Sequence, residues 1–89
     1  MMFPRIIEVN YIKAYQLKLI FNTGEQGEID FEDRIIGRGG VFSALENMEF
    51  FSQVRVDSEI GTIVWPNDVD FCPDVLYSEV TGEPLPLAA

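Results

Sequence analysis

A group of oxygen-bearing side chains near the C-terminus has the residue types that could bind a hard metal cation. The group consists of Asn67, Asp68, Asp70 and Asp74. An EF-hand calcium loop would also need a glycine at its tight turn and a glutamate at its end. This stretch has neither in the required position, and Pro73 interrupts it. We therefore expect local roles instead of a metal site: an Asx turn at Asn67 and Asp68, a bond from Asp70 to nearby backbone, and a helix cap at Asp74.

Three other groups could in principle carry chemistry, and each lacks a required partner. The loop at residues 37–40 could hold an anion, but it lacks the lysine and the serine or threonine of a P-loop. Ser43 and Glu46 have capping-box spacing, and no base that could activate Ser43 is in sight. Adjacent acids such as Glu32 and Asp33 could act as a general acid and base, although an acidic chain offers many such pairs by chance. A carboxylate-based enzyme stays an alternative, but we expect no catalytic residue and no cofactor.

Charge and composition exclude further classes. The chain has no histidine, which rules out Ser-His-Asp and Cys-His triads, and its single cysteine, Cys72, cannot form an intramolecular disulfide. The net charge is −9, and every basic residue lies at or before Arg55. A chain of this charge repels nucleic acid and anionic membranes, so we expect neither as a direct partner. A basic protein is the expected partner.

Length and hydropathy indicate one folded domain. With 89 residues, 47% of them hydrophobic and 12% aromatic, the chain can build one core and is too apolar to be disordered. No apolar run reaches the roughly 18 residues of a membrane helix, and the N-terminus lacks the pattern of a secretory signal. We therefore expect a cytoplasmic protein with a domain over residues 1–82 and a flexible tail over residues 83–89.

Hydrophobic periodicity predicts the elements that position these groups. Alternation predicts a strand over residues 7–12 with Ile7, Val9 and Tyr11 on its buried face, and further strands over 15–21 and 26–31. Residues 32–40 are expected to form a connector. Helical spacing of Val41, Ala44, Leu45, Met48 and Phe51 predicts one helix, or two short turns hinged at an Asn47 cap.

A second hairpin is expected over residues 54–65, followed by a helix that begins at Pro73 and buries Leu76, Tyr77 and Val80. The predicted class is α+β, a small antiparallel sheet of about five short strands with one or two short helices packed on it.

The Trp65-Pro66-Asn67 corner ends the second hairpin and has two interpretations. A tryptophan at a strand end beside acids could be partly exposed and anchor a protein interface. The alternative, which we favour, is a core tryptophan that fills the gap between the sheet and the last helix. The candidate interaction surface comprises Trp65, Pro66, Asn67, Asp70, Asp74 and Tyr77.

The segment from Val54 to Tyr77 resembles the small bacterial and phage proteins grouped as "domain of unknown function 2442". The resemblance extends over nearly the whole chain and includes Gly40-Val41-Phe42, the stretch 51–57 and the Trp-Pro-Asn corner. One departure is Asp68, where the family usually has a glycine, which indicates a backbone position with positive φ. The resemblance implies an α+β domain with no assigned activity. Relatives are often encoded beside another small protein, as in a toxin–antitoxin pair, and some carry a helix-turn-helix.

Three functions follow from these observations. The leading hypothesis is a small non-enzymatic interaction module, the antitoxin-like member of a two-protein pair, which binds a basic protein through its acidic C-terminal face. The alternative is a regulatory or ligand-sensing domain of the kind that relatives fuse to a helix-turn-helix. An enzyme with a carboxylate-based site is the third. A homodimer is compatible with each of them, because a small aromatic-rich domain can leave an apolar patch exposed.

Overall fold

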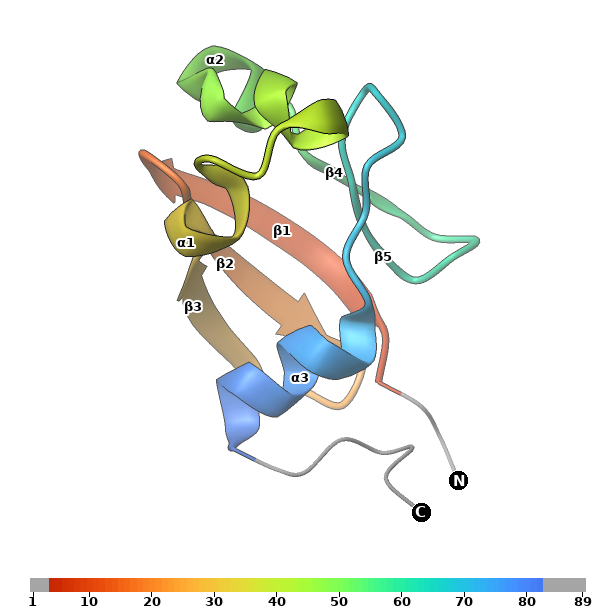
Figure 1. The fold of residues 1–89 in the computed structure, drawn as a ribbon. Coiled ribbons are helices and arrows are strands. Elements are labelled where there is room, and N and C mark those ends of the chain that lie inside the picture. Colours follow the sequence, from red (N-terminus) through yellow and green to blue (C-terminus); the bar gives the residue numbers. More distant parts are fainter. Residues whose placement is uncertain (1–3, 83–89) are drawn as a thin grey trace.

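The N-terminal half of the chain folds into a three-stranded antiparallel meander. The computed structural model describes residues 4–82, so the predicted tail over residues 83–89 lies outside the described part (Figure 1). The meander comprises β1 (Ile6–Lys13), β2 (Gln16–Phe21) and β3 (Gln26–Asp30), in the order β1-β2-β3. A separate two-stranded sheet pairs β4 (Arg55–Asp57) with β5 (Thr62–Val64). The α+β prediction is therefore confirmed, with the five strands divided between two sheets.

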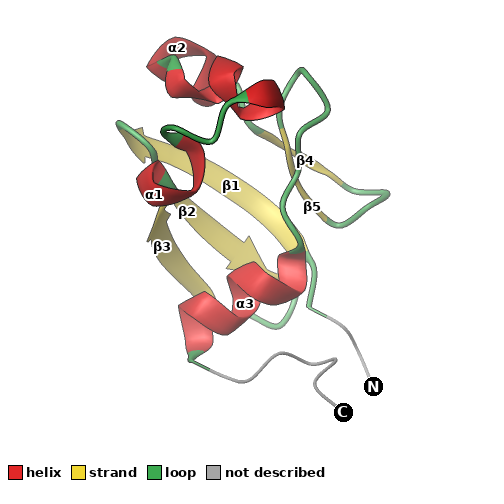
Figure 2. Ribbon diagram, viewed as in Figure 1, coloured by secondary structure: helices red, strands yellow, loops and turns green. Residues whose placement is uncertain are grey.

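Short helical segments connect and cover the strands. Their bounds are α1 (Glu32–Ile35), the 3-10 helix η1 (Gly40–Glu46), α2 (Met48–Phe51) and α3 (Pro73–Thr81). Figure 2 shows α1 and α3 in front of the three-stranded sheet and α2 beyond its upper end. No helix among residues 4–82 is long and apolar enough to cross a membrane.

The central strand β2 follows the predicted alternation, and β1 departs from it. Leu17, Leu19 and Phe21 are fully buried on the face that meets the helices. In β1 the register shifts between Ile6 and Glu8, as in a β-bulge, so that Ile6 pairs with Phe21 and is buried. The prediction that Ile7 faces the core was wrong, because the extra residue turns its side chain outward and leaves it 59% exposed.

The segment from residue 40 to 51 adopts the second of the two predicted forms. Asn47 ends η1 and caps α2, since its side-chain Oδ1 accepts a hydrogen bond of 3.1 Å from the backbone N–H of Phe50. The predicted buried stripe was only partly right. Leu45 and Phe51 are buried, whereas Val41, Ala44 and Met48 are exposed, because three residues per turn in η1 break the expected helical spacing. The predicted connector contains α1, which buries Ile35.

Arg5 and Gly61 join the two sheets. The backbone N–H of Ile6 donates to the carbonyl of Gly61 over 2.9 Å, and the Arg5 guanidinium donates to the carbonyl of Ser58 over 2.6 Å. Gly61 has φ of +70°, and a Cβ there would lie 2.7 Å from the Arg5 guanidinium carbon. Only glycine therefore fits beneath this arginine without a shift of the side chain.

The helix α3 begins at Pro73 as predicted and packs on the inner face of β3. Leu76 is fully buried, and Tyr77 and Val80 are half-buried beside it. The contact with the strand is close at Gly27, where a Cβ would meet a methyl group of Val80 at 2.8 Å. An ion pair between Arg34 of α1 and Glu79 fixes the outer side of the helix.

We expect Gly27→Ala to lower the free energy of unfolding by about 1–3 kcal/mol, because the added methyl overpacks the contact with Val80. In the double variant Gly27→Ala, Val80→Ala this penalty should disappear, leaving a favourable coupling of about 0.5–3 kcal/mol. Urea denaturation of the two single variants and the double variant measures this coupling. Additive losses would show that the close approach of α3 to Gly27 does not limit stability.

Candidate interaction surface

The chain turns sharply after β5 and runs back beside this strand. Most of the predicted site residues lie on this returning segment. The backbone N–H of Trp65 donates to the carbonyl of Val69 over 3.0 Å, and the N–H of Asp68 donates to the carbonyl of Trp65 over 2.9 Å. Asp70 then forms a bridge with Val64. We call residues 66–74 the acidic corner. The main chain of its first half is therefore fixed by hydrogen bonds of the kind found in a tight hairpin.

Trp65 lies beneath the acidic corner, in the core. It is fully buried, and its indole Nε1 donates to the carbonyl of Phe51 over 2.8 Å. Its ring contacts those of Phe51 and Phe71 at centroid distances of 5.4 and 5.7 Å. The prediction that Trp65 lies in the core is correct, and its ring contacts are with residues outside the last helix. Trp65 is withdrawn from the predicted surface because no part of its side chain is accessible to a partner.

Asn67 and Asp68 give the corner its shape. The side-chain Oδ1 of Asn67 accepts from the N–H of Val69 over 3.4 Å, the contact of an Asx turn, and its Nδ2 donates to the carbonyl of Val41 over 3.0 Å. Asp68 has φ of +69°. The positive φ expected at this position is confirmed, and aspartate adopts it at a cost that glycine would avoid.

The acids of the corner point to solvent, and Tyr77 does not join them. Pro66, Asn67, Asp68 and Asp70 are exposed and Asp74 is half-buried at the first turn of α3. The predicted cap at Asp74 was wrong, because the N-cap of α3 is Cys72 and no side chain caps it. Within residues 4–82, Asp68, Asp70 and Asp74 take part in no ion pair. Tyr77 instead packs edge-on against Phe21 at 5.2 Å and donates to Glu25 over 3.4 Å. Its side chain therefore faces the three-stranded sheet.

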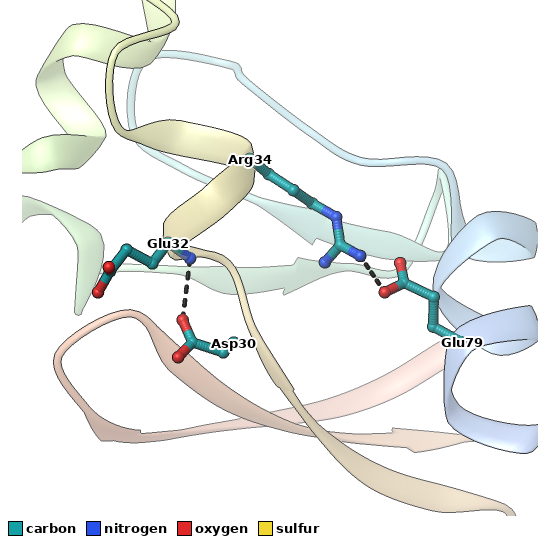
Figure 3. A network of polar contacts seen from close by, with 4 residues as sticks. All are labelled: Asp30, Glu32, Arg34 and Glu79. Carbon is teal, nitrogen blue, oxygen red and sulfur yellow. Dashed lines mark hydrogen bonds and ion pairs between the residues drawn. The ribbon is translucent and has the colours of Figure 1, made fainter.

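The other candidate groups are used for local contacts. The backbone N–H of Gly37, in the loop that could have held an anion, donates to the Glu46 carboxylate over 3.2 Å. The capping-box spacing of Ser43 and Glu46 is accidental, because Ser43 lies inside η1, whose N-cap is Gly39. Figure 3 shows Arg34 reaching Glu79 and Asp30 accepting from the N–H of Glu32. No pocket and no set of metal ligands is found among residues 4–82.

A second acidic stretch lies at residues 25–33, outside the predicted interaction surface. This stretch contains five acidic residues and no basic one, which is visible in the sequence itself. Its meaning depends on the topology, because these residues include the outermost strand of the sheet, β3, and the start of α1.

Comparison with known proteins gives a family and one similar fold. A family model described as a protein of unknown function, DUF2442, matches residues 6–82. No curated protein matches the chain. A solved structure from Nitrosomonas europaea, named a "putative DNA binding protein", has a TM-score of 0.75 at 23% identity, which shows a shared fold. The match covers 90% of this chain and 50% of that one, so this chain spans about half the length of its structural neighbour.

The conformation of Asp68 gives a direct test of the corner. We expect Asp68→Gly to raise the free energy of unfolding by up to about 1 kcal/mol and Asp68→Ala to lower it by about 1 kcal/mol, because alanine pays the full cost of a positive φ. Asp68→Asn tolerates the same backbone and serves as the control for loss of charge. Urea denaturation ranks the variants. A glycine variant less stable than the alanine variant would contradict the left-handed geometry.

Proposed function

The chain belongs to the DUF2442 family, and from this premise we propose that it is a small non-enzymatic protein-interaction module, the antitoxin-like member of a two-protein pair. The observation that carries the proposal is the acidic corner, where three carboxylates make no ion pair within residues 4–82 and the first half of the main chain is fixed by hydrogen bonds. A surface that is ordered before binding loses little conformational entropy when a partner docks.

The acidic corner favours a basic partner. Residues 56–82 contain no lysine or arginine, so nothing in the sequence around the corner offsets its charge. The net charge of −9 adds a long-range attraction for cationic proteins, which raises the association rate and decreases with salt. The exposed side chains of Pro66 and of Val41, whose carbonyl is bound by Asn67, add apolar contact beside the acids.

We expect affinity capture of the tagged protein from its own cells to recover one small basic protein at low salt and much less of it at high salt. Reversing the charges with Asp70→Lys and Asp74→Lys should weaken that complex about tenfold or more, because each lysine repels the partner's cations.

The matched control is the pair Glu49→Lys and Glu59→Lys, which changes the net charge equally on exposed residues outside the corner. Circular dichroism should first confirm that both double variants are folded. If the two double variants weaken the complex equally, the effect comes from net charge, and the acidic corner is not the binding surface.

A second function is supported by the length of the structural neighbour. Since the neighbour is named as DNA binding and this chain spans about half of its length, the shared fold could be the regulatory half of a protein whose other half contacts DNA. In this role the present fold would control the activity of a fused domain and would itself avoid the nucleic acid. A ligand-sensing version of this role gains no support, since no pocket occurs among residues 4–82.

The two functions agree on one outcome with DNA. We expect this chain alone not to bind a fluorescein-labelled DNA duplex at low salt, because a net charge of −9 is repelled by the phosphates. Fluorescence anisotropy measures this directly, with a basic DNA-binding protein as the positive control. Saturable binding that weakens with rising salt would place DNA contacts within this chain and contradict the expected repulsion.

A further inference from the structure

The outermost strand, β3, has one paired edge and one open edge. Two backbone hydrogen bonds mark the two ends of its ladder with β2. The N–H of Phe21 donates to the carbonyl of Glu25 over 2.9 Å, and the N–H of Phe31 donates to the carbonyl of Tyr15 over 2.8 Å. In an antiparallel ladder, alternate residues bond to the same neighbour. The peptide groups of Gly27 and Ile29 therefore face β2. Those facing the open edge belong to Gln26, Glu28 and Asp30, and no described strand lies on that side.

The open edge is held in shape from three directions. On the inner face, Val80 of α3 packs against Gly27. At the end of the strand, the Asp30 carboxylate accepts from the N–H of Glu32 over 2.9 Å (Figure 3). Beyond it, the ion pair of Arg34 with Glu79 joins α1 to α3. The strand is therefore ordered without a partner on its open side.

The side chains along this edge are acidic. Glu28 and Asp30 point to the outer face of the sheet, since Ile29 between them is buried. Glu25, Glu32 and Asp33 flank them and are also exposed. Lys18 lies across from Glu28 on β2 and is the one cation paired to this strand. The edge thus presents three open peptide groups and a surplus of negative charge.

A second copy of the chain is disfavoured at this edge when it uses all three open residues. An antiparallel self-pairing that uses all three open residues sets Glu28 against Glu28 of the copy. Moving the register by two residues toward α1 sets Glu28 against Asp30 twice. Carboxylates directly opposite each other on neighbouring strands are destabilising. The acids therefore oppose these two registers of a homodimer through this edge. A shift the other way sets Glu28 against Gln26 and pairs only two of the three open residues.

We propose that the β3 edge binds an extended segment of a partner protein that carries lysine or arginine at alternate positions. The segment adds a strand to the sheet, and its backbone pairs with the peptide groups of Gln26, Glu28 and Asp30. Side chains alternate along a strand, so every second residue of the segment lies on the outer face beside the two acids. The proposal does not involve residues 66–74 and stands even if the acidic corner only confers solubility.

A peptide of alternating lysine and valine, capped at both ends, is the probe. Titrated into the isotopically labelled protein, it should slow amide hydrogen exchange at Gln26, Glu28 and Asp30 by about tenfold or more at saturation. Exchange at Gly27 and Ile29 should change little, because their amides already bond to β2. A peptide of alternating glutamate and valine should leave all five amides unchanged.

Two variants separate hydrogen bonding from charge. Glu28→Pro removes an amide that faces the open edge and leaves the bonds to β2 intact, so it should weaken peptide binding about tenfold with little loss of stability. Glu28→Gln keeps the amide and removes the charge, and should weaken binding less. If the proline variant does not fold, the peptide can be changed instead of the protein. A lysine–valine peptide N-methylated at the residues that would bond to Gln26, Glu28 and Asp30 tests the same backbone hydrogen bonds.

Several results would overturn the proposal. Equal binding by the Glu28→Pro variant or by the N-methylated peptide would exclude strand addition. Protection at amides outside β3 would move the binding site elsewhere. Protection of Gln26, Glu28 and Asp30 that rises with protein concentration, without peptide, would identify a second copy as the occupant.

Discussion

The fold depends on the burial of one tryptophan. Trp65 can lie in the core only if its indole N–H has an acceptor, and the carbonyl of Phe51 supplies it at 2.8 Å. That carbonyl has no partner within α2, because the helix ends at Phe51. It accepts from the N–H of Val54 over 3.3 Å, and its second lone pair accepts the indole. The burial of Trp65 therefore depends on where α2 ends, and α2 is in turn positioned by its cap at Asn47. A domain of this size buries only about 60% of its unfolded surface, so one well-packed aromatic cluster carries much of its stability.

The sequence predicted those elements whose determinants are local. The Asn47 cap, the helix start at Pro73 and the alternation of β2 follow from single residues or from periods of two, and all are present. Ile7 was misplaced because a β-bulge adds one residue without changing the composition of the strand. The division into two sheets was missed for a similar reason. The place of the second sheet beside the first depends on contacts between residues far apart in the chain, such as the backbone bond from Ile6 to Gly61 and the bond from the Arg5 guanidinium to Ser58.

Site residues were harder to predict, because a charged residue looks the same in sequence whether it is structural or free. Among the six basic residues, Arg5 and Arg34 are engaged in bonds that hold elements together, and Arg38 lies over the Phe42 ring at 4.7 Å. Glu46 and Glu79 are engaged in the same way. Half of the cations are thus committed to the fold, which leaves most acids on the surface without compensation. Only the structure distinguishes the charged residues that hold the fold together from those that are free on the surface.

The remaining acids fall on two surfaces that would recognise a partner differently. The acidic corner offers carboxylates on a turn whose own peptide groups are largely bonded to each other, so it selects for charge and shape. The β3 edge offers open peptide groups in a fixed register, and its acids determine which strand can use them. An edge strand that was neutral would pair with its own copy as readily as with another protein. The same carboxylates that oppose in-register self-association at this edge favour a basic strand, so one feature acts on both solubility and selectivity.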